Sequence, residues 1–497
     1  MKPRAVLAID QGTTGTRAIL FDQKASPISS AYQEFSQIYP QPGWVEHDPV
    51  EIWKSCRAVI NQALAKSRLE ASAIEAIGIT NQRETTILWD KGTGKPVHPA
   101  IVWQDRRTAH FTSGLRKLGY EPVIREKTGL VLDPYFSASK IRWLFDHIPG
   151  LRRRADRGKI AFGTIDAWLL WKLTGGKVHA TDFTNASRTL LFNIKTRQWD
   201  PALLKIFKIP EAILPEVKNS GSCFGYTRDP NSLSKGIPIT AMMGDQQAAL
   251  YGQSCYEKGQ AKNTYGTGCF LMMNLGTQFK KPPFGLLATL ACDEEGKSSY
   301  ALEGAIFIAG AAIQWLRDGL GFFRHARETE KLARKVPDSG GVVVIPALTG
   351  LGSPYWNPHV RGMMTGLTRG TRREHIIRAT LESLAHQTAD VMELMEKYSG
   401  HSVQELKVDG GATANKWLMQ YQADLLNLPV LASERAESTA WGAAKLAGHS
   451  VGFWPSLKRI DGRQKHRKFA PKMKPADRNK SRLIWKREIK RLLFQPA

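Results

Sequence analysis

Apolar positions along the chain follow two spacings, which predict two kinds of element. Short segments rich in apolar and β-branched residues predict strands at 5–10, 16–21, 74–79, 262–265, 269–274 and 341–346. Longer segments with apolar residues three and four positions apart predict helices at 51–65, 138–145, 305–320 and 374–398. The apolar run at 304–313 is far shorter than the roughly 20 residues that span a bilayer, and it predicts a buried helix. Strands and helices interspersed in this way predict a layered α/β fold.

A strand–loop–strand unit occurs twice, and the two copies predict two domains of related design. The first unit covers 5–21 and the second covers 262–274, about 250 residues later. A chain of 497 residues has room for two large domains or three smaller ones. We predict a break near 250–260, with an N-terminal domain at 1–252 and a C-terminal domain at 253–497. A ligand site is then expected in the cleft between the two domains.

The chain is strongly basic, with a net charge of +25 that suggests an anionic partner. About half of this excess lies in 456–497, where 15 lysines and arginines accompany three acidic residues. Apolar residues recur at helical spacing within this tail, at Leu483, Ile484, Trp485, Ile489, Leu492 and Leu493. The pattern predicts a terminal helix with one docked face and one solvated face. Nucleic-acid binding is the less favoured interpretation, because no binding motif or row of aromatic residues accompanies the charge.

The five cysteines are widely spaced, and no Cys-x-x-Cys pair occurs. This pattern indicates neither a disulfide framework nor a zinc site, and it fits a reducing cytoplasm. No secretory segment is evident, because Asp10 interrupts the first apolar run. His375 and His386 lie on one predicted helix but lack a metal-binding spacing. We therefore expect a cytoplasmic protein that does not insert into a membrane.

The loop after the first strand reads Asp-Gln-Gly-Thr-Thr-Gly-Thr-Arg at 10–17 and is a candidate phosphate site. Glycines allow the backbone to approach a phosphate, while backbone N–H groups and threonine hydroxyls can donate to its oxygens. Arg17 can neutralise phosphate charge, and Asp10 could hold Mg²⁺ through water molecules. Considered alone, however, the sequence is more typical of a structural hairpin turn.

Two later loops strengthen the phosphate hypothesis. A Gly-Thr-Gly sequence at 266–268 could bind the same phosphates from the opposite domain. An Asp-Gly-Gly sequence at 409–411 leads from a strand into a helix, and its paired glycines would let an adenosine lie against the backbone. No Walker A loop occurs, and no Gly-x-Gly-x-x-Gly fingerprint follows a strand. The three loops together predict an ATP-binding cleft.

The order of these loops resembles that of the actin-like ATPase superfamily, in which two actin/ribonuclease-H-like ATPase domains flank an interdomain cleft. The segments at 135–144 and 362–367 are similar to the two signatures of the FGGY carbohydrate kinases. Segments that resemble the glycerol-phosphorylating members of this family lie at 80–86, 101–108, 133–136 and 244–250. The resemblance extends in order from about residue 5 to 450. It implies an ATP- and Mg²⁺-dependent kinase that converts glycerol to sn-glycerol 3-phosphate.

The resemblance also assigns roles to side chains. Asp245 would be the general base for the attacking hydroxyl, although its position equally suits a helix N-cap. The implied substrate-binding residues are Arg83, Glu84, Trp103, Tyr135, Asp245, Gln246 and Phe270. Arg83 and Glu84 can pair with hydroxyls, so an analogue without them would leave polar groups unpaired. Trp103 and Phe270 would form an apolar wall along the carbon chain.

The implied nucleotide-binding residues are Thr13, Thr14, Gly15, Arg17, Thr267, Gly310, Gln314, Gly411 and Asn415. Asp10 and Asp245 would hold Mg²⁺ through water molecules. At Gly15 the chain departs from the family, which usually has a hydroxyl residue there. A backbone contact survives this change, but a side-chain contact is lost.

Regulation and rival functions are the remaining expectations. Some relatives bind a sugar bisphosphate at a glycine-rich loop, and others carry a phosphorylatable histidine nearby; the stretch at 229–236 lacks both features, so either control is doubtful here. Relatives suggest a homodimer or homotetramer. The rivals are a kinase of the same family for another small polyol or ketose, a non-catalytic ATP-binding scaffold, and a basic nucleic-acid binder. The Arg83-Glu84 pair with Trp103 argues against the first rival.

Overall fold

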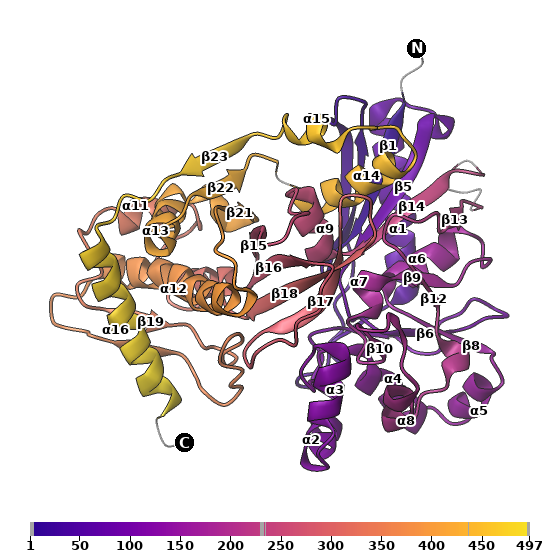
Figure 1. Cartoon of the computed structure of the whole chain (residues 1–497), viewed down its shortest axis with the longest axis horizontal. Helices are drawn as coiled ribbons and strands as arrows, with labels where there is room; N and C mark the ends of the chain where they lie inside the picture. Colours follow the sequence, from indigo (N-terminus) through magenta and orange to yellow (C-terminus); the bar gives the residue numbers. More distant parts are fainter. Residues whose placement is uncertain (1–3, 229–232, 234, 436, 495–497) are drawn as a thin grey trace.

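Two mixed β-sheets lie side by side at the centre of the computed structural model (Figure 1). The structure describes residues 4–228, 233, 235–435 and 437–494. The first sheet has the spatial order β13 (Gly225–Tyr226), β14 (Pro238–Gly244), β5 (Ile74–Asn81), β1 (Ala5–Gln11), β2 (Gly15–Phe21) and β3 (Pro27–Glu34). The second has the order β17 (Leu287–Cys292), β18 (Ser298–Ile306), β16 (Cys269–Gly276), β15 (Ala261–Tyr265), β21 (Leu406–Asp409), β22 (Val430–Ser433) and β23 (His466–Phe469).

The two sheets repeat one connectivity, as the two strand–loop–strand units predicted. β1 runs antiparallel to β2 and parallel to β5, and β15 runs antiparallel to β16 and parallel to β21. β3 and β18 extend the antiparallel sides, while β14 and β22 extend the parallel sides. The predicted α/β class is therefore confirmed. In such sheets ligands bind beyond the carboxyl ends of the parallel strands, where the candidate loops lie.

Helix α1 (Pro49–Ser67) covers one face of the first sheet, and its sequence explains where it begins. The N-cap Asp48 accepts a hydrogen bond from the Val50 N–H, and Pro49 occupies the first turn. The side chains that it buries include Ile52, Cys56, Val59, Ile60 and Ala63. The same core takes in residues of α6 (Ile165–Leu173). This layer fixes β1 and β2, and with them the loop between them.

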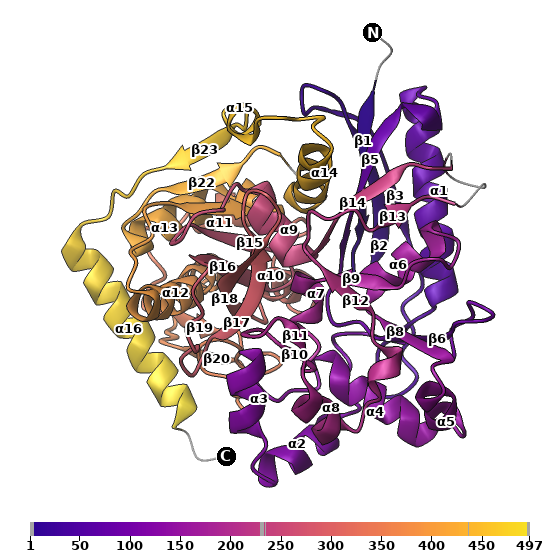
Figure 2. The ribbon, with the colours of Figure 1, turned by 45° about the vertical axis from the view of Figure 1, so that its right-hand side comes forward.

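Helices α9 (Asp245–Gly252) and α14 (Ser438–Ser450) cross between the two sheets (Figure 2). α14 packs on β5 and β1 of the first sheet, whereas α9 packs on β15 of the second. A Cβ added at Gly442 would overlap the carbonyl oxygen of Ala248, and one added at Gly252 would overlap that of Ser438. The two backbones can approach this closely only because glycine stands at both crossing points.

Replacing Gly442 by alanine should lower the free energy of unfolding by about 1–3 kcal/mol, as overpacked sites do. The matched control is Gly114→Ala in α2 (Ala109–Lys117), where an added Cβ meets no atom within 4 Å. In that control the free energy of unfolding should rise by about 0.5–1 kcal/mol, because alanine stabilises a helix interior relative to glycine. Urea denaturation of both variants measures the difference, and equal stabilities would contradict the close crossing.

The second sheet is covered by α12 (Arg373–Ser399) and α13 (Lys416–Leu426), with α10 (Gly310–Asp318) and α11 (Glu328–Ala333) nearby. The basic tail forms α16 (Pro475–Leu493), which lies on the outside of this domain (Figure 1). Its docked face buries Trp485, Ile489 and Leu492, so the predicted terminal helix is confirmed. Leu483, which the spacing placed on that face, is instead 70% exposed.

The predicted buried helix at 304–313 is wrong in its first half. Residues up to Ile306 belong to β18, and α10 begins only at Gly310. All nine residues of β18 are buried, and a Cβ at Gly304 would overlap Val391 of α12. A continuous apolar run is compatible with either a buried strand or a buried helix, so the pattern alone could not separate them. The other predicted strands and helices are present, with ends that differ by a few residues.

Further helices in the described part are α3 (Glu121–Thr128), α4 (Ser137–His147), α5 (Leu151–Asp156), α7 (Phe183–Ala186), α8 (Pro201–Phe207) and α15 (Leu457–Asp461). Further strands are β4 (Glu46–His47), β6 (Ile87–Asp90), β7 (Ala100–Ile101), β8 (Ile160–Gly163), β9 (Ala180–Asp182), β10 (Phe192–Asn193), β11 (Gln198–Trp199), β12 (Glu216–Lys218), β19 (Val343–Ile345) and β20 (Met363–Thr365). Helices α2 to α5 and α8 share a separate buried cluster beside the first sheet.

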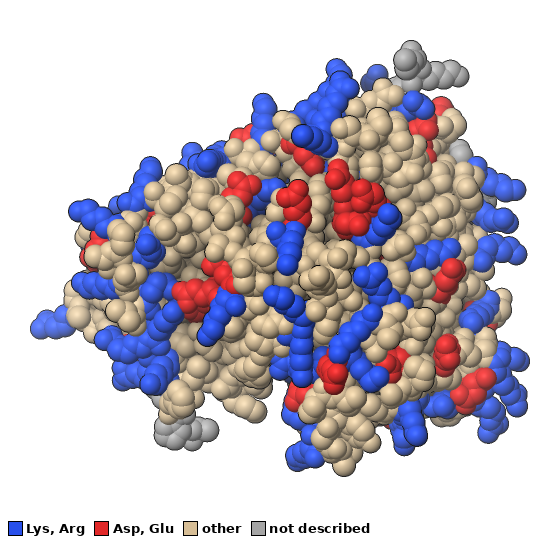
Figure 3. All heavy atoms as spheres, viewed as in Figure 1, with Lys and Arg blue, Asp and Glu red and all other residues tan. Residues whose placement is uncertain are grey.

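Basic side chains are spread over the whole face of the molecule that Figure 3 shows, with smaller acidic groups among them. They do not gather into one stripe on that face. None of the helices among the described residues has the length and apolar character needed to cross a membrane.

Candidate active site

The β1–β2 turn that contains Thr13 and Thr14 is held by backbone hydrogen bonds. The Gly12 N–H donates to the Gly15 carbonyl at 2.9 Å, and the Phe35 N–H donates to the Thr14 carbonyl at 3.3 Å. These bonds turn backbone carbonyls inward and leave Thr14 exposed at the tip of the loop. The backbone thus orders the loop while the Thr14 hydroxyl stays accessible, and backbone N–H groups and hydroxyls of this kind can bind phosphate oxygens.

The β15–β16 turn is tied to the start of α10. The Gly266 N–H donates to the Gly268 carbonyl at 2.8 Å, and the Gly310 N–H donates to the Gly266 carbonyl at 3.0 Å. Thr267 and Gly310, which the sequence resemblance assigned separately to the nucleotide, are thus neighbours. Gln314 lies one turn further along α10 and is exposed.

The loop after β21 passes close to β15. Gly410 has φ +92°, and a Cβ there would overlap the Tyr265 backbone, so this turn requires glycine. A Cβ at Gly411 would meet no atom within 4 Å, which leaves open space above the backbone. The Asn415 side chain caps α13 by accepting from the Leu418 N–H at 2.9 Å. Any nucleotide contact by Asn415 would be additional to this structural role.

Strand register brings the catalytic candidates of the first sheet to one edge. Asp10 of β1 and Met243 of β14 both pair with Thr80 of β5. Asp245 therefore follows β14 at the edge where β1 ends at Gln11 and where β5 leads into the Arg83-Glu84 segment. Residues separated by more than 200 positions in sequence converge here through pairing of parallel strands.

Asp10 and Asp245 carry carboxylates that influence each other. Burial, followed by the negative charge of Asp245, raises the pKa of Asp10 to about 7, and Arg17 only partly offsets this. Two carboxylates that repel one another form a donor set suited to a hydrated divalent cation. No group of three or more metal-ligating side chains occurs among the described residues, so such an ion would need water and phosphate oxygens as further ligands.

Asp245 is the first residue of α9 and is not its N-cap, since Gly244 has that position. Its Oδ1 accepts from the Gln246 N–H at 2.7 Å and lies 3.3 Å from Nε of Arg83. The side chain is 33% exposed, whereas the neighbouring Arg83 and Glu84 are almost completely buried. Asp245 is thus the carboxylate of this group that solvent, and hence a ligand, can reach.

Arg83 and Glu84 belong to a buried cluster of four charged side chains. Arg83 donates to the two carboxylate oxygens of Glu303 at 2.5 and 3.1 Å. Arg188 donates to Glu84 at 2.6 Å and to Glu303 at 2.9 Å. Burial alone would raise the pKa of Glu303, but the guanidiniums of Arg188 and Arg83 outweigh it and lower that pKa to about 2. Two positive and two negative groups compensate each other, so the cluster is rigid and nearly neutral.

Backbone geometry fixes Glu84 within this cluster. Its φ of +61° lies in the left-handed region, which is uncommon for a residue other than glycine. Two side-chain donors of α4 hold this backbone conformation in place. The Glu84 carbonyl accepts from Ser137 Oγ at 3.1 Å and from Lys140 Nζ at 3.2 Å. A left-handed residue held by buried donors is typical of a functional position.

Trp103, one of the two residues expected to form an apolar wall, contacts both Tyr135 and the phosphate loop. Trp103 packs edge-on against Tyr135, with ring centroids 5.6 Å apart, and its Nε1 donates to Thr13 Oγ1 at 3.0 Å. Arg188 packs against the Tyr135 ring at 5.7 Å. One guanidinium nitrogen of Arg188, Nη1, is buried and has no hydrogen-bond partner among the described residues. The Trp103–Tyr135 pair therefore borders a buried guanidinium N–H group of Arg188 that has no hydrogen-bond partner among the described residues.

Lys262 brings the second sheet into contact with this region. Its Nζ donates to Gln246 Oε1 at 2.6 Å and to the Phe270 carbonyl at 3.3 Å. Burial lowers the pKa of Lys262 to about 8, although the carboxylates of Asp409 and Asp245 act in the opposite direction. The predicted residues Gln246 and Phe270 are thus held by a lysine that links the second sheet to α9.

Sequence reasoning missed Arg188, Glu303 and Lys262. Glu303 and Lys262 could have been suspected, because each is the lone charged residue of an otherwise uncharged, buried strand. Arg188 lies in a short turn after α7 and gave no comparable signal. Arg17, which was predicted to meet phosphate, contacts the carboxylate of Glu437 just before α14.

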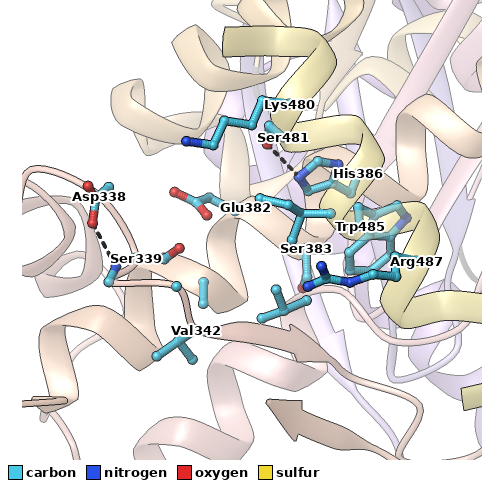
Figure 4. Close-up of a pocket in the computed structure, with 15 residues that line it drawn as sticks. Asp338, Ser339, Val342, Glu382, Ser383, His386, Lys480, Ser481, Trp485 and Arg487 are labelled. Carbon is cyan, nitrogen blue, oxygen red and sulfur yellow. Dashed lines mark hydrogen bonds between the residues drawn. The ribbon is translucent and has the colours of Figure 1, made fainter. Parts of the chain in front are cut away.

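A cavity of about 590 Å³ lies elsewhere, between α12, α16 and the loop that precedes β19 (Figure 4). Partly buried Glu382 and buried His386 of α12 line it, and Lys480 and Arg487 reach it from α16. It contains none of the predicted substrate or nucleotide residues, and it does not change the assignment of the site. The stretch at 229–236 lies largely outside the described residues.

Comparison with known proteins gives consistent results. Models of the N-terminal and C-terminal domains of the FGGY family of carbohydrate kinases match residues 5–252 and 261–451. The chain is 53% identical to the glycerol kinase of Alkaliphilus oremlandii over 489 residues, which cover 98% of this chain and 97% of that one. It is 54% identical to glycerol kinase 2 of Thermotoga maritima, with 98% of both chains covered. The crystal structure of Plasmodium falciparum glycerol kinase with ADP is similar, with a TM-score of 0.93, 37% identity and 99% of both chains covered.

Proposed function

This chain belongs to the FGGY family of carbohydrate kinases, and we propose that it transfers the γ-phosphate of ATP to glycerol. The observation that carries the proposal is the position of Asp245, whose accessible carboxylate lies 3.3 Å from Nε of the buried Arg83 and whose charge raises the pKa of the phosphate-loop carboxylate of Asp10. Glycerol kinases at 53% identity over nearly the whole chain support the choice of substrate. The products are sn-glycerol 3-phosphate and ADP.

Glycerol binds in the region bordered by the buried charged cluster and by the aromatic rings of Trp103 and Tyr135. Arg83 donates to a substrate hydroxyl, Glu84 accepts from another, and Tyr135 supplies a further hydroxyl contact. Trp103 and Phe270 line the carbon chain. Because Glu84 is held by Arg188 and by the donors beneath its backbone, the acceptor is fixed before the substrate arrives, which reduces the cost of orienting it.

The chemical step needs positioning and charge neutralisation more than covalent help. The oxygen of a terminal glycerol hydroxyl forms a bond to the γ-phosphorus while the bond from that phosphorus to the bridging oxygen breaks. ADP keeps the electron pair of the broken bond, and the hydroxyl proton passes to Asp245. Asp10 and Asp245 would hold Mg²⁺ through water molecules, and the bound ion would neutralise phosphate charge.

ATP lies across the three loops, with its phosphates between Thr13, Thr14 and Thr267 and its adenosine above Gly411. We assign the substrate and phosphate loops to an N-terminal domain at 1–252 and the binding of the rest of the nucleotide to a C-terminal domain at 253–497. Closure of these parts excludes water, which would otherwise accept the phosphate. The crossing of α9 and α14 connects the two sheets.

A substrate panel tests this function. With Mg²⁺ and ATP, we expect kcat/KM for glycerol to exceed that for xylulose, erythritol and 1,2-propanediol by at least about 10²-fold, because missing or displaced hydroxyls leave Arg83 or Glu84 unpaired. Coupled ADP release measures each rate. Strong activity on a ketose together with none on glycerol would replace this proposal by the rival kinase of the same family.

A further inference from the structure

The phosphate loop lacks a side chain at one point. The Thr13 hydroxyl accepts a hydrogen bond from Nε1 of Trp103, and Thr14 is exposed, but Gly15 contributes backbone only. The next hydroxyl cannot help, because Thr16 is buried and shares a hydrogen bond of 2.8 Å with Ser55. The loop therefore has no hydroxyl of its own directly after Thr14 that could face a phosphate.

Tyr32 of β3 occupies the space that a side chain at position 15 would fill. A Cβ added to Gly15 would lie 2.5 Å from Tyr32 Oη and 2.6 Å from its Cζ. The nearest atom is thus the hydroxyl oxygen at the far end of the ring. Tyr32 pairs with Arg17 across the β2–β3 ladder, so the strand register fixes where its backbone lies and to which face of the sheet its side chain projects.

The Tyr32 ring also packs against Arg17, with the guanidinium carbon 5.1 Å from the ring centroid. Tyr32 is 44% exposed, and the contact of its side chain within the described part of the chain is the ring packing against Arg17, with no hydrogen bond from the hydroxyl. A tyrosine that served only to cover Arg17 would not need the hydroxyl. An unpaired hydroxyl at the missing side chain of a phosphate loop instead suits an anionic oxygen.

We propose that Tyr32 is a nucleotide-contact residue, whose hydroxyl donates to the phosphate chain of ATP at the place left open by Gly15 while its ring stays packed against Arg17. This inference rests on the proposed function only in taking the β1–β2 turn as the phosphate site. It implies that positions 15 and 32 form one unit: a larger residue at 15 and the tyrosine at 32 exclude each other.

The first test is Tyr32→Phe, which keeps the ring over Arg17 and removes the hydroxyl. Loss of a hydrogen bond to a charged group should weaken ATP and ADP binding by about tenfold in calorimetry. Binding of adenosine, which has no phosphate, and the KM for glycerol should stay within about twofold, since the lost bond is to phosphate. Tyr226→Phe, at the opposite edge of the same sheet, is the matched control and should change none of these values.

The second test exchanges the two positions. Gly15→Ser alone should weaken ATP binding, because its Cβ would overlap the Tyr32 ring. Gly15→Ser combined with Tyr32→Ala should recover most of the loss, because space and a hydroxyl are both restored. Additive losses in the double variant would overturn the proposal.

The outcomes separate this inference from the proposed function. If the wild-type protein phosphorylates glycerol and Tyr32→Phe binds ATP normally, the inference on Tyr32 is wrong and the function stands. If Tyr32→Phe weakens adenosine as much as ATP, the residue acts through local folding and the proposal also fails. If the wild type binds ATP through Tyr32 but does not phosphorylate glycerol, the function fails while the inference survives.

Discussion

Replacing Asp245 by asparagine should lower kcat for glycerol phosphorylation by about 10²- to 10⁴-fold, the usual contribution of a general base. Asparagine keeps the size of the side chain and its hydrogen bond from the Gln246 N–H, but it cannot accept the hydroxyl proton. The dissociation constant for ADP, measured by calorimetry, should change little, because the nucleotide is held mainly by the three loops. Asp156→Asn on α5, an exposed aspartate paired with Arg152, is the control and should keep full activity.

This prediction also separates a kinase from a non-catalytic ATP-binding scaffold. A scaffold would lose nothing when Asp245 becomes asparagine, since nucleotide binding is retained. Full turnover in the variant would show that another group accepts the proton. A parallel loss of ADP binding and thermal stability would instead make Asp245 a structural residue of the start of α9.

Replacing Glu303 by glutamine should lower the free energy of unfolding by about 3–5 kcal/mol, because two buried guanidiniums lose their shared counter-charge. Arg83 and Arg188 both donate to this one carboxylate, which comes from the second sheet. The loss of stability should appear in urea denaturation. The KM for glycerol should also rise, because Arg83 loses its contact with Glu303 and Arg188, which holds Glu84, loses one as well. The control Glu75→Gln breaks an exposed pair with Arg4 and should cost less than about 1 kcal/mol.

The effect of Glu303 has a defined dependence on pH. Its pKa in the folded protein is about 2, below the ordinary value of 4.5, so the charged form is stabilised by folding. This stabilisation is present above about pH 4.5 and is lost as the pH falls towards 2; a shift of this size corresponds to about 3 kcal/mol. The stability difference between the wild type and Glu303→Gln should be constant from pH 8 to 5 and shrink below that range. A difference that grows on acidification would contradict the assigned ion pairs.

Local patterns predicted the parts of the fold that depend on neighbours in sequence. The β1–β2 and β15–β16 hairpins follow from short apolar segments that flank Gly/Thr turns, and the structure has both. The terminal helix follows from apolar spacing, yet Leu483 is exposed because only part of α16 faces a partner. The segment at 304–306 was placed in a helix because its pairing partner, β16, cannot be read from local spacing.

The site was predictable only where a resemblance supplied the long-range information. The pairing of Asp245 with Arg83 joins the start of α9 to the segment that follows β5, and nothing in either segment alone indicates the other. Arg188 and Glu303 were missed for the same reason, since their partners lie 104 to 220 positions away in sequence. Charge balance inside the protein is a property of the assembled fold, and composition does not report it.

The placement of α14 has a consequence for synthesis of the chain on the ribosome. Its residues Trp441, Ala444 and Ala447 share a buried cluster with Val6, Ala8 and Ala76 of the first sheet. Those early strands can pair once about residue 244 has been made, but one face of their sheet then has no cover for the next two hundred residues or so. A nascent chain in this state presents apolar surface to other chains and to chaperones. The cover of this face of the first sheet must therefore wait for a helix that is translated long after the strands themselves.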